Sequence, residues 1–140
     1  MLTIKTHKYM KRTFAAFLLL VLCLSPAMAE EPQAEIKFDK ITHDFGQFTE
    51  ANALVSTTFT FTNVGDAPLV ITQCVASCGC TVPTYSDKPI APGKTGQIKV
   101  TYNGKGRVFG PFSKVITVMT NAKTKMTRLS IKGEMVEKKQ

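Results

Sequence analysis

Histidine is scarce in this sequence, and most residue patterns that support catalysis are missing. The chain has two histidines, His7 and His43, and His7 lies in an N-terminal segment that we expect to be removed. A Ser–His–Asp grouping would have to use His43, and no nucleophile-elbow pattern accompanies it. Residues 103–106 do not form a phosphate loop, because no Ser or Thr follows the lysine and no helix is predicted after it. Several aspartates are expected in turns, where the carboxylate caps backbone donors: Asp39, Asp44 and Asp66. The sequence therefore predicts a protein that is not an enzyme and has no cofactor.

The sequence also lacks a concentrated basic surface. Its 18 Lys and Arg exceed its 10 Asp and Glu by a formal charge of +8. Four of the basic residues fall in the first twelve positions, so the rest of the chain carries +4. No basic stripe with interleaved aromatic residues is present, and scattered lysines often keep an exposed sheet soluble. We therefore expect no nucleic-acid partner.

The N-terminus has the three-part pattern of a secretory signal peptide. Basic residues come first, an unbroken apolar run covers residues 14–24, and Ser25-Pro26 ends it. Small residues then occupy the two positions that define a cleavage site, so we predict cleavage after Ala29. The apolar run is shorter than the roughly 20 residues of an ordinary membrane span. Two alternatives remain, a retained N-terminal anchor and a lipid anchor on Cys23, which the bulky Leu22 before it disfavours.

The predicted domain organisation follows from this pattern. Residues 1–29 are the signal peptide, residues 30–35 a flexible leader, residues 36–136 one domain, and residues 137–140 a polar tail. Cleavage leaves 111 residues, enough to bury a core without help from disulfides. We expect an exported protein, in the periplasm or at the cell surface, that meets the membrane only during export.

Period-two alternation is the main secondary-structure pattern, and it is clearest at residues 55–63. Val55, Phe59 and Phe61 fall on one face, and Ser and Thr side chains fall on the other. Thr57 is the one exception, a polar residue on the predicted inward face. The pattern recurs further along the chain, at residues 97–102, 116–119 and 129–133. No apolar stripe keeps helical spacing for three turns. Short strands with Gly, Pro and Asn turns between them predict an all-β, two-sheet antiparallel β-sandwich of about seven strands.

Three expectations concern the path of the chain. Gly46 predicts a kink where the N-terminal strand crosses from one sheet edge to the other. Residues 69–75 predict an apolar strand entered at Pro68, and no strand is predicted at residues 83–85. Pro92-Gly93 predicts a tight turn, because proline fixes φ and glycine supplies a positive φ.

Three cysteines occur within seven residues, at Cys74, Cys78 and Cys80. Export implies an oxidising compartment in which disulfides persist, and the odd number leaves at least one cysteine free, intermolecular or ligand-bound. Any two of the three can pair. A Cys78–Cys80 bridge would close a small, strained and comparatively reducible ring. Any of these short loops would contribute about 2 kcal/mol or less through chain entropy.

Three interpretations of the cysteines stay open at this point. They form a local clip or packed thiols at a strand end, a soft-metal site, or a thiol–disulfide exchange site. Three thiolates would suit Cu(I) or Zn²⁺, with His43 as the available imidazole for a fourth ligand. The exchange site would lack a Cys-x-x-Cys motif at a helix N-terminus to lower a thiol pKa.

The chain resembles the bacterial domain-of-unknown-function family 1573. The resemblance rests on four motifs: residues 43–46 (His-Asp-Phe-Gly), residues 59–65 followed by Pro68-Leu69, residues 77–81 (Ser-Cys-Gly-Cys-Thr), and Pro92-Gly93. It covers about residues 36–136 and implies an immunoglobulin-like sandwich related to major sperm protein and Hydin-type domains, in a family whose members are typically exported. Cys74 is not part of the family pattern.

Two functions are compatible with these features. The first is an exported, non-catalytic module that binds an unidentified exported or envelope protein through a sheet edge or a loop face. The second is a metal-binding or thiol-exchange protein that uses the cysteine cluster.

Overall fold

The computed structural model of the protein describes residues 30–137, which from Pro32 onward form one compact unit. The predicted signal peptide with Cys23 and Ala29, and most of the predicted tail, lie outside the described residues. Within residues 30–137, no helix has the length and apolar character needed to span a membrane.

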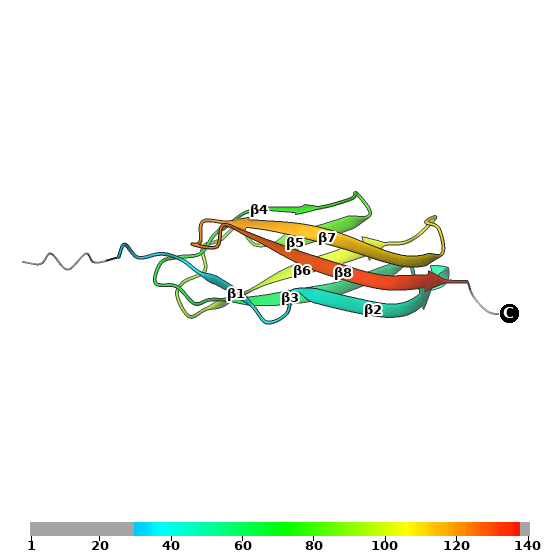
Figure 1. Ribbon diagram of the computed structural model, residues 1–140, viewed down its shortest axis with the longest axis horizontal. Helices are drawn as coiled ribbons and strands as arrows, with labels where there is room; N and C mark the ends of the chain where they lie inside the picture. Colours follow the sequence, from blue (N-terminus) through cyan, green and yellow to red (C-terminus); the bar gives the residue numbers. More distant parts are fainter. Residues whose placement is uncertain (1–29, 138–140) are drawn as a thin grey trace, which may run out of the picture. The chain divides into compact units, whose positions relative to one another are not determined.

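The described chain folds into two packed β-sheets (Figure 1). The first sheet has the order β1 (Ile36–Phe38), β3 (Leu54–Asn63), β6 (Thr95–Asn103), β5 (Thr81–Tyr85). The second has the order β2 (Thr42–Thr49), β8 (Met126–Val136), β7 (Gly110–Thr120), β4 (Ile71–Ala76). A short 3₁₀ helix, η1 (Glu50–Asn52), joins β2 to β3. The predicted all-β sandwich is confirmed, although β2 pairs with β8 in parallel.

The core lies between the sheets and is formed by inward side chains of the longer strands. Alternation places every second residue of β3, β6, β7 and β8 inward, as the sequence predicts, and Thr57 is also buried. The following core residues have no exposed surface: Phe59, Phe61, Leu69, Ile98, Val100, Ile116, Val118, Leu129 and Ile131. Burial of these side chains supplies most of the free energy that holds the sheets together.

The crossing between the sheets occurs earlier than predicted. β1 ends at Phe38 and β2 begins at Thr42 in the other sheet, so the chain crosses at residues 39–41. Gly46 has a φ of 65° and lies at a register shift between Asp44 and Gln47, so it forms a bulge within β2. The prediction of a crossing at Gly46 is wrong, because the positive φ serves this bulge.

Two strand predictions also need correction. β4 begins at Ile71, and the buried Leu69 instead forms a single bridge with Ile90. β5 was not predicted, because Pro83 lies at its centre. Proline lacks an N–H donor, yet β5 is an edge strand whose outer side needs no partner, so it accommodates Pro83.

The segment before β1 is bound to the sandwich. Its carbonyl oxygens accept backbone hydrogen bonds of 2.8–2.9 Å: Gln33 from Asp66, Ala34 from Lys123, and Glu35 from Val64. A Cβ atom on Gly65 would overlap backbone atoms of residues 33–35, so this close approach requires glycine. The expectation of a flexible leader is therefore wrong for residues 33–35.

The buried amide of Asn63 joins three segments. Its Oδ1 accepts hydrogen bonds from the N–H groups of Gly65 at 3.0 Å and Glu35 at 3.4 Å. Its Nδ2 donates to the carbonyl oxygens of Ala67 at 2.8 Å and Ile90 at 2.9 Å. Because Asn63 is 0% exposed, these bonds satisfy a side chain that water does not reach.

Candidate functional site

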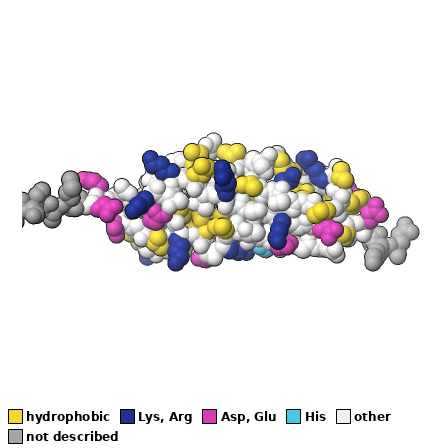
Figure 2. Space-filling model, viewed as in Figure 1, with side chains coloured by type: hydrophobic (Ala, Val, Ile, Leu, Met, Phe, Trp, Pro, Cys, Tyr) yellow, Lys and Arg dark blue, Asp and Glu magenta, His cyan; other side chains and the backbone are white. Residues whose placement is uncertain are grey.

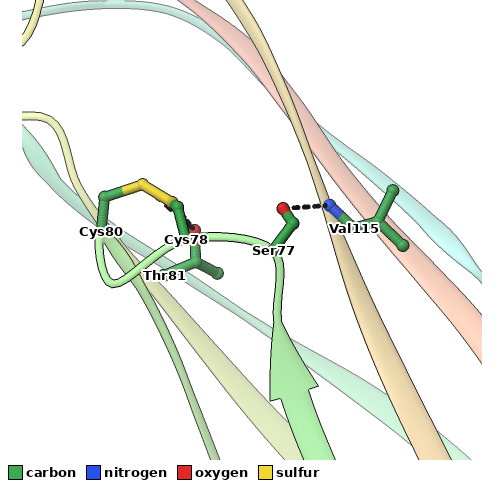
Figure 3. Close-up of a disulfide and its surroundings, with 5 residues drawn as sticks. All are labelled: Ser77, Cys78, Cys80, Thr81 and Val115. Atoms are coloured by element: carbon green, nitrogen blue, oxygen red, sulfur yellow. Dashed lines mark hydrogen bonds between the residues drawn. A yellow bond between two sulfur atoms is a disulfide. The ribbon is translucent and has the colours of Figure 1, made fainter.

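The loop between β4 and β5 carries a disulfide between Cys78 and Cys80 (Figure 3). Ser77 binds β7 twice: its N–H donates to the carbonyl oxygen of Val115 at 2.9 Å, and its Oγ accepts from the Val115 N–H at 3.3 Å. At the other end of the loop, the Asn103 N–H donates to the Cys80 carbonyl oxygen at 2.8 Å. Backbone contacts with both sheets thus position the loop without the S–S bond.

The hydroxyl of Thr81 lies beside both sulfur atoms of this disulfide (Figure 3). Thr81 Oγ1 is 3.7 Å from Cys78 Sγ and 3.8 Å from Cys80 Sγ. In the described part of the chain, these sulfurs are its only hydrogen-bond partners. Thr81 and Cys80 are buried, whereas Cys78 is partly exposed. Disulfide sulfur is a weak acceptor, so the hydroxyl contacts are weak while the bond is intact.

β4 differs from the other edge strands of the described sheets. Three edges carry features that discourage pairing with another chain. β1 has three residues and includes Lys37, β2 has a bulge and the charged Asp44, and β5 contains Pro83. β4 contains neither a charged residue nor a proline, and its register shift lies at its start, between Ile71 and Gln73. Residues 73–76 therefore form a regular free edge.

The outer face beside this edge carries several exposed apolar side chains. Val75 on β4, Val115 and Met119 on β7 and Met126 on β8 are exposed and point away from the core. We call these four residues the outer apolar patch. On the face drawn in Figure 2, hydrophobic side chains lie between those of Lys and Arg. Two polar residues lie on the same face: Arg128 pairs in register with Thr117, which pairs with Val75.

The family model described as "Protein of unknown function (DUF1573)" matches residues 36–135. The chain belongs to this family. The resemblance found in the sequence motifs is thereby confirmed. Among curated proteins, no relative matches the sequence of this DUF1573 domain.

Solved structures share the immunoglobulin-like fold of the DUF1573 domain. A protein of unknown function from Porphyromonas gingivalis W83 superposes with a TM-score of 0.64 at 16% identity, covering 79% of this chain and 51% of that one. The ASH/PapD-like domain 7 of human CEP192 superposes with a TM-score of 0.62 at 11% identity, covering 83% of this chain and 95% of that one. The periplasmic chaperone SfaE superposes with a TM-score of 0.51 at 12% identity, covering 75% of this chain and 59% of that one. The chain thus spans about half the length of the P. gingivalis protein, and identities this low show the fold alone.

The predicted metal ligands do not meet in the DUF1573 domain. His43 lies on β2 and Cys74 on β4, the opposite edges of one sheet, which are about 14 Å apart at the usual strand spacing. The sulfurs of Cys78 and Cys80 are bonded to each other. His43 Nδ1 lies 3.2 Å from Lys40 Nζ, and partial burial together with this ammonium lowers the histidine pKa. Within residues 30–137, no three His, Cys, Asp or Glu side chains are placed to hold a metal ion. The four predicted ligands therefore do not form a metal site in the described part of the chain.

We expect Cys74 of the DUF1573 domain to react slowly with alkylating reagents. It is the free cysteine of the described residues, and burial raises its pKa from 9.0 to about 11. The thiolate is the reactive form, so at pH 8 labelling should be about a hundredfold slower in the folded protein than in urea. Timed iodoacetamide labelling with peptide mapping measures both rates. Equal rates in the two conditions would contradict this assignment.

Sequence reasoning missed two parts of this site. The outer apolar patch was detectable, because Met119 and Met126 occupy positions that alternate with inward residues. The contact of the Thr81 hydroxyl with both sulfurs was not detectable from the sequence, because it depends on how the chain turns after Gly79.

Proposed function

We propose that this domain is a non-catalytic module of the bacterial cell envelope that binds an extended segment of another exported protein at the free edge of β4. The observation that carries the proposal is the combination of an uncharged, proline-free edge with the outer apolar patch beside it. An added strand would gain main-chain hydrogen bonds from the edge and apolar contacts from the patch.

The proposed partner segment alternates apolar and acidic residues. Its apolar side chains would contact Val75 at the edge, and its acidic side chains would suit the net positive charge of +4 that the chain carries outside the predicted signal peptide. The excess of basic over acidic residues outside the predicted signal peptide disfavours a second copy of this chain as the occupant.

Location in the envelope is supported by the signal-peptide pattern of residues 1–29. It is further supported by the likeness in fold to SfaE, a protein described as a periplasmic chaperone. The shortage of converging catalytic groups in the sequence supports a binding role over an enzymatic one.

Displayed random decapeptides selected on the purified protein provide the test. We expect enriched peptides to alternate apolar and acidic residues and to protect amides of β4 (Ile71–Ala76) from hydrogen exchange. Val75→Lys should weaken their binding about tenfold or more, because it removes an apolar contact and adds a charge at the edge.

Val82→Lys is the matched control. Val82 lies on β5, the corresponding edge of the other sheet, and is 56% exposed against 49% for Val75. Peptides that bind both variants equally, or that protect another segment, would overturn the proposal. Protection of β4 that rises with protein concentration alone would assign the edge to a second copy instead.

A further inference from the structure

The Cys78–Cys80 disulfide contributes little to holding the fold. It closes a loop of three residues, and the entropy lost by the unfolded chain on closing so short a loop is small. The loop is already bound to β7 through Ser77 and to β6 through Asn103. The two strands it joins keep their own partners, since β4 pairs with β7 and β5 with β6. Reduction should therefore leave the sandwich folded.

The two sulfur atoms differ in access. Cys80 is 5% exposed and belongs to the hydrophobic core cluster, whereas Cys78 is only partly buried and precedes the exposed Gly79. Thiol–disulfide exchange requires in-line approach of a thiolate to one sulfur, so access decides which sulfur is attacked. In this loop the accessible sulfur belongs to Cys78.

The Thr81 hydroxyl would gain a strong acceptor when the bond opens. Its contacts of 3.7 and 3.8 Å to the two sulfurs are weak in the disulfide. A thiolate is charged, and hydrogen bonds to charged acceptors are shorter and roughly twice as strong. The hydroxyl thus stabilises the negative charge that develops on the departing sulfur during opening more than it stabilises the intact disulfide.

We propose that Cys78–Cys80 is a redox-active couple that exchanges with the dithiol of another exported protein, by attack at Cys78 and with Thr81 as hydrogen-bond donor to the departing sulfur. A partner thiolate attacks Cys78 Sγ, and a mixed disulfide forms as the bond to Cys80 breaks. The electron pair goes to Cys80 Sγ, which accepts a hydrogen bond from Thr81 Oγ1 and then a proton from solvent.

The partner completes the exchange. The second thiolate of the partner attacks the partner sulfur that is bonded to Cys78 in the mixed disulfide. Cys78 leaves as a thiolate, which takes up a proton. In total the partner dithiol is oxidised to a disulfide, and Cys78 and Cys80 are reduced by two electrons and two protons. Cys74 takes no part, because its buried thiol is protonated at neutral pH.

The first experiment measures opening of the disulfide in the folded protein. Dithiothreitol serves as the dithiol probe, maleimide quenching with peptide mapping follows each cysteine, and circular dichroism follows the fold. We expect Thr81→Val to slow opening about tenfold or more and Thr81→Ser, which keeps the hydroxyl, to restore most of the rate. Thr84→Val, at an exposed position on the same strand, is the control and should open at the wild-type rate.

A second experiment tests the direction of attack. With oxidised glutathione as the probe, Cys80→Ser should form a mixed disulfide at Cys78 about tenfold or more faster than Cys78→Ser forms one at Cys80. Opening only after unfolding, equal rates for Thr81→Val and Thr84→Val, or equal glutathione reactivity of the two serine variants would each overturn the proposal.

Discussion

Replacing Asn63 with leucine is expected to lower the free energy of unfolding by about 4 kcal/mol, since several buried groups lose their partners together. The change removes two hydrogen bonds accepted by Oδ1 and two donated by Nδ2. The carbonyl oxygens of Ala67 and Ile90 and the N–H of Gly65 would lose a partner in a part-buried region. Leucine fits the volume of the site approximately, so the loss reflects unsatisfied polar groups.

Urea unfolding of wild type and variant measures this loss. Asn103→Leu is the control, because Asn103 is exposed and its side chain accepts one hydrogen bond, from the Lys105 N–H at 3.0 Å. Its expected cost is about 1 kcal/mol or less. A similar small cost for Asn63→Leu would show that the amide does not join the three segments as described.

Gly65→Ala is expected to cost about 3 kcal/mol and to release the segment before β1. The added Cβ would overlap the Gln33 carbonyl oxygen and the Glu35 N–H, which are backbone atoms and cannot move alone. Displacing the segment would break the three backbone hydrogen bonds of residues 33–35, each worth about 1 kcal/mol net. Hydrogen exchange should show loss of protection at residues 64 and 66, whose amides donate to it.

Gly79→Ala provides the matched control for this prediction. A Cβ atom at Gly79 would meet nothing within 4 Å, so the variant should be as stable as wild type. If both alanine variants unfold at the same urea concentration, the close packing of residues 33–35 against Gly65 does not exist in solution.

The sequence predicts the fold best where one face of a strand is buried and the other is exposed to solvent. β3 shows this alternation through Phe59 and Phe61, and its predicted inward face is correct. Prediction fails where a local rule is overridden by position in the sheet. Pro83 argues against a strand until it is known that β5 is an edge, and Gly46 indicates a kink without saying which sheet contains it.

The candidate site was predicted only in part, for a related reason. The cysteine spacing identified the loop, but pairing and access depend on the turn that buries Cys80 and leaves Cys78 at the surface. The proposed role of His43 as a ligand failed, because sequence spacing does not reveal that β2 and β4 are opposite edges. Strand order is a long-range property that local alternation does not encode.

The position of β8 limits when this chain can fold. β8 lies between β2 and β7, and its side chains Leu129 and Ile131 fill the core, yet within residues 30–137 it is the strand synthesised last. β2 has no strand neighbour until β8 arrives, so an N-terminal part emerging from the ribosome cannot close its second sheet. Such late, long-range pairing slows folding. If the chain is exported as proposed, this delay would keep the domain unfolded, and therefore able to pass through a translocation pore, until β8 has been synthesised.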